Sequence, residues 1–303
     1  MRILTKLFIV CVILLAIVVT GYYSIFYVKG PSIQAKSYIL IDADTRKVLH
    51  KKNENIPLSA ASMSKMMTEY IVLKHIKEGK LDWDDEVNIT ENYLQSTGVK
   101  IEVTLGTTIK VRDLFQSMVI ASANNAAVAL AEKIAGSEEQ FTVLMNEQAK
   151  ELGLSKYTHF VNATGLPNLL NEESVMTASD VAELAYHLLY DFPEVLDTTK
   201  LSMYQLQYDG SHVFTTNEML HSGNADLWFE GVDGLKTGFT DQAGYCFAGT
   251  AKQGDRRLIS VVMGTEEKHA RFIETKKLFS FGFEKPYVPS LKYIVSQYIQ
   301  PYF

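Results

Sequence analysis

Three short strings of the sequence carry side chains that could together perform acyl transfer. In chain order they are Ser62-x-x-Lys65, Ser122-x-Asn124 and Lys236-Thr237-Gly238. They supply a hydroxyl nucleophile, an amine base, a second hydroxyl beside an amide, and a cation that can hold a carboxylate. A serine activated by a lysine forms acyl-enzymes without any histidine. The strings predict this chemistry only if the surrounding elements bring them into one site.

The first string lies near the start of an expected helix that runs from an N-cap at Ser59 to Glu78. Residues i and i+3 share a helix face, so the Lys65 amine can reach the Ser62 hydroxyl. A lysine with the ordinary pKa of about 10.4 is protonated and cannot act as a base. Burial, or a neighbouring cation such as Lys236, would lower that pKa and free the lone pair. The alternative is a chance match on a solvated face, which the apolar neighbours of Ser62 disfavour.

The second string interrupts two apolar helical segments, 112–120 and 124–134. Polar side chains at such a break project from a short connection that the core anchors on both sides. A second Ser-x-Asn match, at residues 222–224, lies in a polar connection shortly before the third string, and a loop explains it fully. We therefore assign Ser122 and Asn124 to the candidate site.

The third string is expected in a strand over residues 235–239. Lys236 and Thr237 would face an anionic end of the substrate. Gly238 would let the substrate backbone approach and pair with the strand edge. The alternative is an edge-strand lysine that discourages aggregation.

The elements around these strings predict an α+β fold. Strands are expected at both ends of the sequence and helices in its middle, so early and late strands must share one antiparallel sheet beside a helical lobe. A cleft between the two parts is a natural location for a site. The remaining expected elements are a hairpin of 37–41 and 48–51, strands within 99–110, helices 138–152 and 178–190, strands 213–216, 245–251 and 257–263, and a closing helix 268–281.

Composition narrows the function classes. The chain has 303 residues, 47% of them hydrophobic, and a net charge of −6, which argues against nucleic-acid binding. Its histidines show no paired spacing and its glycines form no phosphate-binding loop, so we expect neither a metal nor a cofactor. Cys11 and Cys246 are too far apart in the sequence for an intramolecular disulfide to be expected.

The N-terminal segment predicts membrane attachment. Arg2 and Lys6 precede an uncharged run from residue 7 to residue 28, which is long enough to cross a bilayer. Polar residues near its end leave a cleaved signal peptide open, although residues 33–35 form a poor cleavage site. In either case the following domain is exported. The expected division is an anchor or signal segment at 1–30, a catalytic domain at 31–285 and a short tail at 286–303.

The three strings together resemble the penicillin-recognising serine enzymes. Further strings resemble the D-alanyl-D-alanine carboxypeptidases, the low-molecular-mass penicillin-binding proteins, over about residues 36–285. They are Ser122 to Ala127, Thr158 to Leu166, Val232 to Gly238 and Ala243 to Cys246. The resemblance implies a β-lactamase/transpeptidase-like fold. Two departures are Ser-Ala-Asn in place of the usual Ser-Gly-Asn, and a short tail where relatives carry a β-rich second domain, which we expect to be absent.

The resemblance also implies a reaction. Ser62 would attack the carbonyl between the two terminal D-alanines of a peptidoglycan stem peptide while Lys65 takes its proton. The backbone N–H groups of Ser62 and Phe239 would stabilise the oxyanion, and Ser122 would pass a proton to the leaving amine. β-Lactam antibiotics would inhibit the enzyme by acylating Ser62. The expected localisation is the cell membrane, with the catalytic domain outside the cytoplasm.

The same resemblance assigns the substrate contacts. Asn124 would hold the substrate amide and orient Lys65, while Lys236 and Thr237 bind the terminal carboxylate. Two other functions stay open. A β-lactamase would need rapid deacylation, for which Glu172 and Glu173 are candidates outside the usual Glu-x-x-Leu-Asn setting. A non-catalytic membrane-bound sensor of muropeptides or β-lactams is the other.

Overall fold

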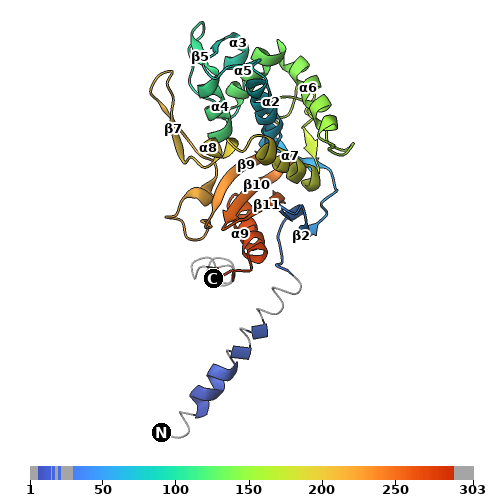
Figure 1. The fold of residues 1–303 in the computed structure, drawn as a ribbon, viewed down its shortest axis with the longest axis vertical. Helices are drawn as coiled ribbons and strands as arrows, with labels where there is room; N and C mark the ends of the chain where they lie inside the picture. Colours follow the sequence, from blue (N-terminus) through green and yellow to red (C-terminus); the bar gives the residue numbers. More distant parts are fainter. Residues whose placement is uncertain (1–5, 15, 18–19, 22–29, 290–303) are drawn as a thin grey trace.

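A five-stranded antiparallel sheet joins the two ends of the chain in this computed structural model (Figure 1), which describes residues 6–14, 16–17, 20–21 and 30–289. The strand order is β2-β1-β11-β10-β9. The first strand pairs along its whole length with the last, from Ser37 opposite Met263 to Asp42 opposite Leu258. This confirms the expected sheet. Its strands are β1 (Ser37–Asp42), β2 (Val48–Lys52), β9 (Val232–Thr240), β10 (Gly244–Gln253) and β11 (Arg256–Thr265).

The middle of the chain forms a helical lobe on one side of this sheet, as expected (Figure 1). Three two-stranded pairs accompany the helices: β3 (Leu58–Ser59) with β6 (Val175–Met176), β4 (Glu86–Asn88) with β5 (Thr108–Lys110), and β7 (Met203–Gln205) with β8 (His212–Phe214). The helices are η1 (Ala61–Ser64), α2 (Lys65–Lys77), α3 (Glu91–Gln95), α4 (Val111–Ile120), α5 (Asn124–Ala135), α6 (Glu138–Glu151), α7 (Ala178–Asp191), α8 (Val195–Thr199) and η2 (Glu218–Leu220).

Helix α2 lies at the centre of this lobe. Helices α4, α5, α6 and α7 all contact it. Every residue from Lys65 to Leu73 is buried, polar residues included. A helix that is buried all round has no solvated face. The polar residues in the first two turns of α2 therefore lie in the interior, which excludes a solvated face as the setting of the first string.

Alternating side chains of the sheet fill two cores. Ile39 and Ile41 belong to the core shared with the helical lobe, whereas Leu40 belongs to a second core. In that second core the sheet packs against α9 (Ala270–Gly282), which supplies Phe272 and Phe279. Side chains of a strand alternate between faces, so one strand can serve both cores. The helical lobe and α9 thus hold the sheet, and the site-bearing strand β9, from opposite sides.

Two predicted elements are wrong in their bounds. Ser59 does not cap a helix, because it lies in β3 and donates its hydroxyl to Glu173, and a 3₁₀ turn separates it from α2. Of the stretch 99–110 only Thr108–Lys110 forms a strand. Earlier in that stretch the backbone of Ile101 is bound instead by the amide side chain of Asn125, at 3.1 and 2.9 Å. The other elements lie within a few residues of their expected bounds.

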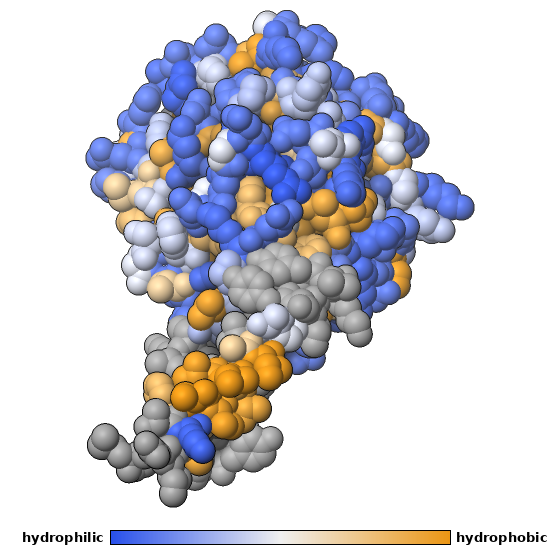
Figure 2. All heavy atoms as spheres, turned by 60° about the horizontal axis from the view of Figure 1, so that its bottom comes forward, coloured by the Kyte–Doolittle hydropathy of each residue, from blue (hydrophilic) through white to orange (hydrophobic). Residues whose placement is uncertain are grey.

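The N-terminal segment is described only in part. Residues 6–14 are helical with exposed apolar side chains, which Figure 2 shows gathered at the lower end of the molecule. Among the described residues, no helix is both long and apolar enough to span a bilayer. The expected anchor or signal segment lies partly outside the described residues, as does most of the expected tail.

Candidate active site

The candidate nucleophile and the candidate base of the first string lie within hydrogen-bond distance. Ser62 sits on η1, partly exposed, and Lys65 begins α2, fully buried. The Lys65 Nζ is 3.0 Å from the Ser62 Oγ and donates to the Asn124 Oδ1 and to the Thr164 carbonyl, both at 2.6 Å. A neutral amine has two N–H groups and one lone pair. Two oxygen acceptors take the two N–H groups, which leaves the lone pair directed to the Ser62 hydroxyl.

The surroundings of Lys65 favour its neutral form. Burial lowers the pKa of Lys65 well below the ordinary lysine value, and the positive charge of Lys236 lowers it further. Burial and a neighbouring cation are the two causes that we expected to lower the pKa of a lysine base. The neutral amine is the form that can accept the proton of Ser62.

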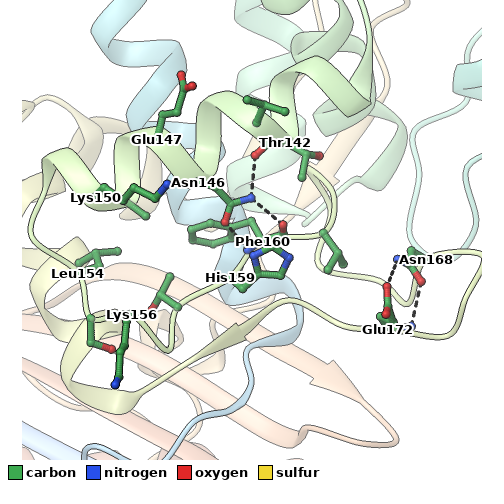
Figure 3. A pocket seen from close by; sticks show the side chains of 15 residues that line it. Thr142, Asn146, Glu147, Lys150, Leu154, Lys156, His159, Phe160, Asn168 and Glu172 are labelled. Atoms are coloured by element: carbon green, nitrogen blue, oxygen red, sulfur yellow. Dashed lines mark hydrogen bonds between the residues drawn. The ribbon is translucent and has the colours of Figure 1, made fainter.

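The loop between α6 and β6 supplies one of the two Lys65 acceptors. Figure 3 shows Asn146 of α6 bound to the start of this loop, where its side chain pairs with the backbone N–H and carbonyl of Phe160 at 2.9 and 2.8 Å. Further along, the Asn162 Oδ1 accepts from the backbone N–H groups of Thr164 and Gly165 at 3.1 and 2.7 Å. These contacts fix the Thr164 carbonyl against Lys65. Residue-by-residue reasoning missed this role, because any residue type can offer a carbonyl.

Gly165 lets the same loop approach the helix of the nucleophile. Its φ is +77°, and an added Cβ would lie 2.0 Å from the Ala61 carbonyl oxygen. We expect Gly165→Ala to lower the free energy of unfolding by about 3 kcal/mol or more, because strain and overlap add. Gly153→Ala is the matched control, since its φ is +72° and nothing lies within 4 Å. Denaturant unfolding should show a much smaller loss for the control, and equal losses would contradict the overlap.

Ser122 links the second string to the third. It connects α4 to α5 with a φ of +65°, a left-handed conformation that is uncommon outside glycine. The buried Lys236 Nζ of β9 donates to the Ser122 Oγ at 2.9 Å. Because Lys236 is only 1% exposed, it is not an edge lysine that repels other strands. The competing match is an exposed turn, and Ser222 does not line the cavity that contains Ser62.

Asn124 joins the base to the cavity wall. While its Oδ1 accepts from Lys65, its Nδ2 donates to the Thr97 carbonyl at 2.7 Å. Its backbone N–H donates to the Val99 carbonyl, also at 2.7 Å. An amide nitrogen carries two hydrogens, and the Thr97 carbonyl takes one of those of Asn124. Asn124 is only 3% exposed and is not among the residues that line the cavity containing Ser62.

The third string lies along the edge strand of the sheet. The Thr237 hydroxyl is hydrogen bonded to the hydroxyl of Thr216 at 2.7 Å. A Cβ on Gly238 would lie 2.9 Å from the Ala60 carbonyl oxygen, so this glycine allows β9 to pack against η1. That reason differs from the expected one, which was close approach of a substrate. Phe239 is 45% exposed and stacks on Tyr245.

Arg271 of α9 adds a second buried cation that sequence reasoning missed. Its Nη1 donates to the Gly238 carbonyl at 3.1 Å. Burial lowers the pKa of Arg271 to about 10 and that of Lys236 to about 8. Arg271 lies far in the sequence from each of the three strings, so no sequence pattern indicated that it belongs to the site.

The three strings open onto one cavity of about 370 Å³. Ser62, Ser122, Thr216, Thr237, Phe239 and Arg271 are among the residues that line it. Lys65 and Lys236 are not among the lining residues, but they are hydrogen bonded to Ser62 and Ser122, which are. A larger cavity of about 980 Å³ lies between α6 and the following loop (Figure 3), and neither Ser62 nor Ser122 is among its lining residues. The smaller cavity can therefore combine a serine nucleophile, an amine base and cations for a carboxylate.

Neither candidate glutamate for deacylation reaches this cavity. The Glu173 carboxylate accepts hydrogen bonds from Ser59 and, at 2.7 Å, from Thr240. Glu172 is exposed and pairs with Asn168. Neither of them lines the cavity.

Known proteins share this fold. Penicillin-binding protein D2 of Listeria monocytogenes, solved with ampicillin bound, is 36% identical with a TM-score of 0.76, covering 84% of this chain and 100% of that one. The fold implied by the resemblance is thereby confirmed. D-alanyl-D-alanine carboxypeptidases DacF of Bacillus subtilis and DacC of Escherichia coli are each 36% identical, over 83% and 84% of this chain. The chain spans 63% of the length of either relative.

The family model described as D-alanyl-D-alanine carboxypeptidase, peptidase family S11, matches residues 25–267, most of the chain. That range includes all three strings and the strands and helices that carry them. The chain therefore belongs to the D-alanyl-D-alanine carboxypeptidase family.

Proposed function

We propose that the protein is a serine D-alanyl-D-alanine carboxypeptidase that removes the terminal D-alanine from peptidoglycan stem pentapeptides. The observation that carries the proposal is the buried Lys65 amine, 3.0 Å from the Ser62 hydroxyl, with its N–H groups engaged by two other acceptors. Membership of the family supports the same activity.

In the acylation step the Ser62 Oγ bonds to the substrate carbonyl carbon and its proton passes to the Lys65 Nζ. The backbone N–H groups of Ser62 and Phe239 stabilise the resulting oxyanion. When the C–N bond breaks, Ser122 donates its proton to the leaving D-alanine amine and takes up the proton held by Lys65, which returns the base to its neutral form. The hydrogen bond between Ser122 and the Lys236 Nζ, at 2.9 Å, supports this role. Water then hydrolyses the ester on Ser62 and restores the enzyme.

Substrate selection rests on charge. Thr237 and Arg271 line the cavity, and the buried Lys236 lies behind Ser122, to which it donates; together they suit the terminal carboxylate of the stem peptide. Asn124 orients Lys65 by accepting its hydrogen bond. β-Lactams carry a carboxylate beside a strained amide, and we propose that they inhibit by acylating Ser62, as the ampicillin-bound Listeria relative suggests.

Neither of the other two functions has comparable support. A β-lactamase needs a base for deacylation, and the engagement of Glu173 with Ser59 and Thr240 counts against it. A non-catalytic sensor would not need the arrangement around Lys65. A penicillin adduct that persists, together with D-alanine release, would separate the carboxypeptidase from both.

We further propose that residues 31–285 form the catalytic domain and that it acts outside the cytoplasm on the cell wall. The uncharged run from residue 7 to residue 28 would attach it to the membrane or be cleaved during export. Separating the membrane and soluble fractions of expressing cells, with N-terminal sequencing, would decide between these outcomes.

The activity is tested by D-alanine release from diacetyl-Lys-D-Ala-D-Ala, with inhibition by penicillin. We expect Lys236→Ala to lower kcat/KM on this substrate by about 10- to 100-fold, because a charge-assisted hydrogen bond to the carboxylate is lost. The preference over the same peptide with a C-terminal amide should shrink equally. Lys252→Ala, an exposed lysine on the neighbouring strand, is the matched control. An unchanged preference in Lys236→Ala would remove Lys236 from carboxylate recognition.

A further inference from the structure

Glu69 is a buried acid next to the site that the proposed reaction does not use. It follows Lys65 by one turn of α2 and is 1% exposed. Neither oxygen of its carboxylate has a hydrogen-bond partner among the described residues. Residues i and i+4 of a helix share a face, so Glu69 lies on the same side of α2 as the base.

Burying a carboxyl group without hydrogen bonds lowers the stability of the fold, so the presence of Glu69 needs another explanation. Asp113 is equally buried, but its two oxygens accept from the Tyr204 hydroxyl at 3.0 Å and the Tyr208 N–H at 2.8 Å. A buried carboxyl with no such bonds loses its hydration without compensation. Burial accordingly raises the pKa of Glu69 to about 8. An apolar side chain of similar size would fill the same space without this cost, so packing does not account for a glutamate.

Two lysines of the site, on two different elements, are within electrostatic reach of Glu69. Lys65 lies on its own helix, Lys236 comes from β9, and the Glu69 carboxylate acts electrostatically on both. Beyond them, Glu138 of α6 acts on Lys65, and Arg271 of α9 acts on Lys236. The hydrogen bonds described for the two lysines all go to hydroxyl and carbonyl oxygens and none to a carboxylate. Glu69 is therefore placed to balance their charge through space.

The two lysines have opposite requirements. Lys65 must be neutral to accept a proton, whereas Lys236 must be cationic to hold a carboxylate. Burial and the Arg271 charge both favour loss of the Lys236 proton, and an ionised Glu69 opposes that loss. We propose that Glu69 is the internal counter-charge that keeps Lys236 cationic, and thus able to hold a substrate carboxylate, at mildly alkaline pH. Glu69 is in this sense a positioning residue, and its role rests on the proposed function.

The direction of the pH effect follows from the pH range in which Glu69 is ionised. At acidic pH the carboxyl is neutral, so its removal leaves the acid limb of the rate profile, which Lys65 controls, in place. As the pH rises through about 8 the carboxylate becomes ionised and raises the pKa of Lys236. Glu69→Gln removes that charge, so Lys236 should lose its proton at a lower pH. The alkaline limb alone should move.

The test is the pH dependence of acylation by a fluorescent penicillin. We expect Glu69→Gln to move the alkaline limb about one pH unit lower, which is a tenfold slower reaction at a fixed pH on that limb. Below pH 7 its rate should stay within about twofold of the parent. Glu69→Asp retains the charge and should restore the limb. Glu78→Gln, an exposed glutamate after the same helix, is the matched control.

Two results would overturn the inference. A Glu69→Gln profile that superimposes on the parent profile would show that the charge has no influence, and an equal loss at every pH would indicate a structural role. Should Glu69→Gln not fold, as judged by circular dichroism, Glu69→Met supplies the uncharged variant with apolar packing. The same expectations apply to it.

A second measurement does not depend on activity. In protein labelled with ¹³C at the lysine ε carbon, the Lys236 resonance, identified by its loss in Lys236→Met, should titrate about one unit lower in Glu69→Gln. If the parent chain neither releases D-alanine nor binds penicillin, the proposed function fails while this titration still tests Glu69. An unchanged Lys236 titration overturns the inference in either case.

Discussion

Ser62→Ala should abolish covalent labelling by fluorescent penicillin and reduce D-alanine release by about four orders of magnitude or more. The Ser62 Oγ is the only hydroxyl within hydrogen-bond distance of the Lys65 amine among the described residues. Alanine removes the atom that bonds to the substrate and leaves the helix otherwise unchanged. Labelling on a gel, with D-alanine measured in a coupled assay, provides both readouts.

Ser64→Ala is the matched control for this prediction. Its hydroxyl lies in the same string but donates to the Ala61 carbonyl at 2.8 Å and is fully buried. The variant should retain labelling and lose only about 1 kcal/mol of stability, the contribution of one hydrogen bond. Labelled Ser62→Ala protein would mean that another residue is the nucleophile, and peptide mapping of the adduct would identify it.

Lys65→Arg should lower the acylation rate by about 10²- to 10⁴-fold, although arginine also has a long basic side chain. Guanidinium remains protonated at every accessible pH and offers no lone pair to the Ser62 proton. The parent enzyme should stay active well below the ordinary pKa of lysine, since burial lowers the pKa of Lys65. Acylation rates measured from pH 5 to pH 10 test both statements.

Lys77→Arg, in the last turn of the same helix and exposed, serves as the control. It should leave the acylation profile unchanged. If Lys65→Arg were acylated at a rate close to that of the parent, the base would have to be another group. The two hydrogen bonds that Lys65 donates to Asn124 and Thr164 would then be purely structural.

Local spacing was sufficient to predict the pairing of Ser62 with Lys65, because i and i+3 positions of a helical segment always share a face. The meeting of the three strings was not predictable from spacing. It came from their resemblance to a known family. The structure brings these strings together, and it separates Ser122 from the exposed match at Ser222.

Properties that depend on tertiary packing were harder to predict from the sequence. The burial of Glu69 depends on helices α4, α5, α6 and α7, which contact α2 and come from other parts of the sequence. The burial of Lys236 likewise depends on residues distant in sequence, such as Ser122. The Thr164 acceptor is a backbone carbonyl, which any residue type supplies. None of these three features can be recognised from the local sequence.

The pairing of the first strand with the last has a consequence for when activity can appear. The site depends on contacts between residues far apart in the sequence, since Lys236 contacts Ser122, which precedes it by 114 residues. Strand β1 finds its partner β11 only after the site-bearing β9 and its neighbour β10 have been synthesised. A chain that has not yet completed β9 therefore has Ser62 and Lys65 but lacks Lys236 and Thr237. Penicillin labelling would therefore report completed folding, and its onset during refolding would time the docking of the sheet onto the helical lobe.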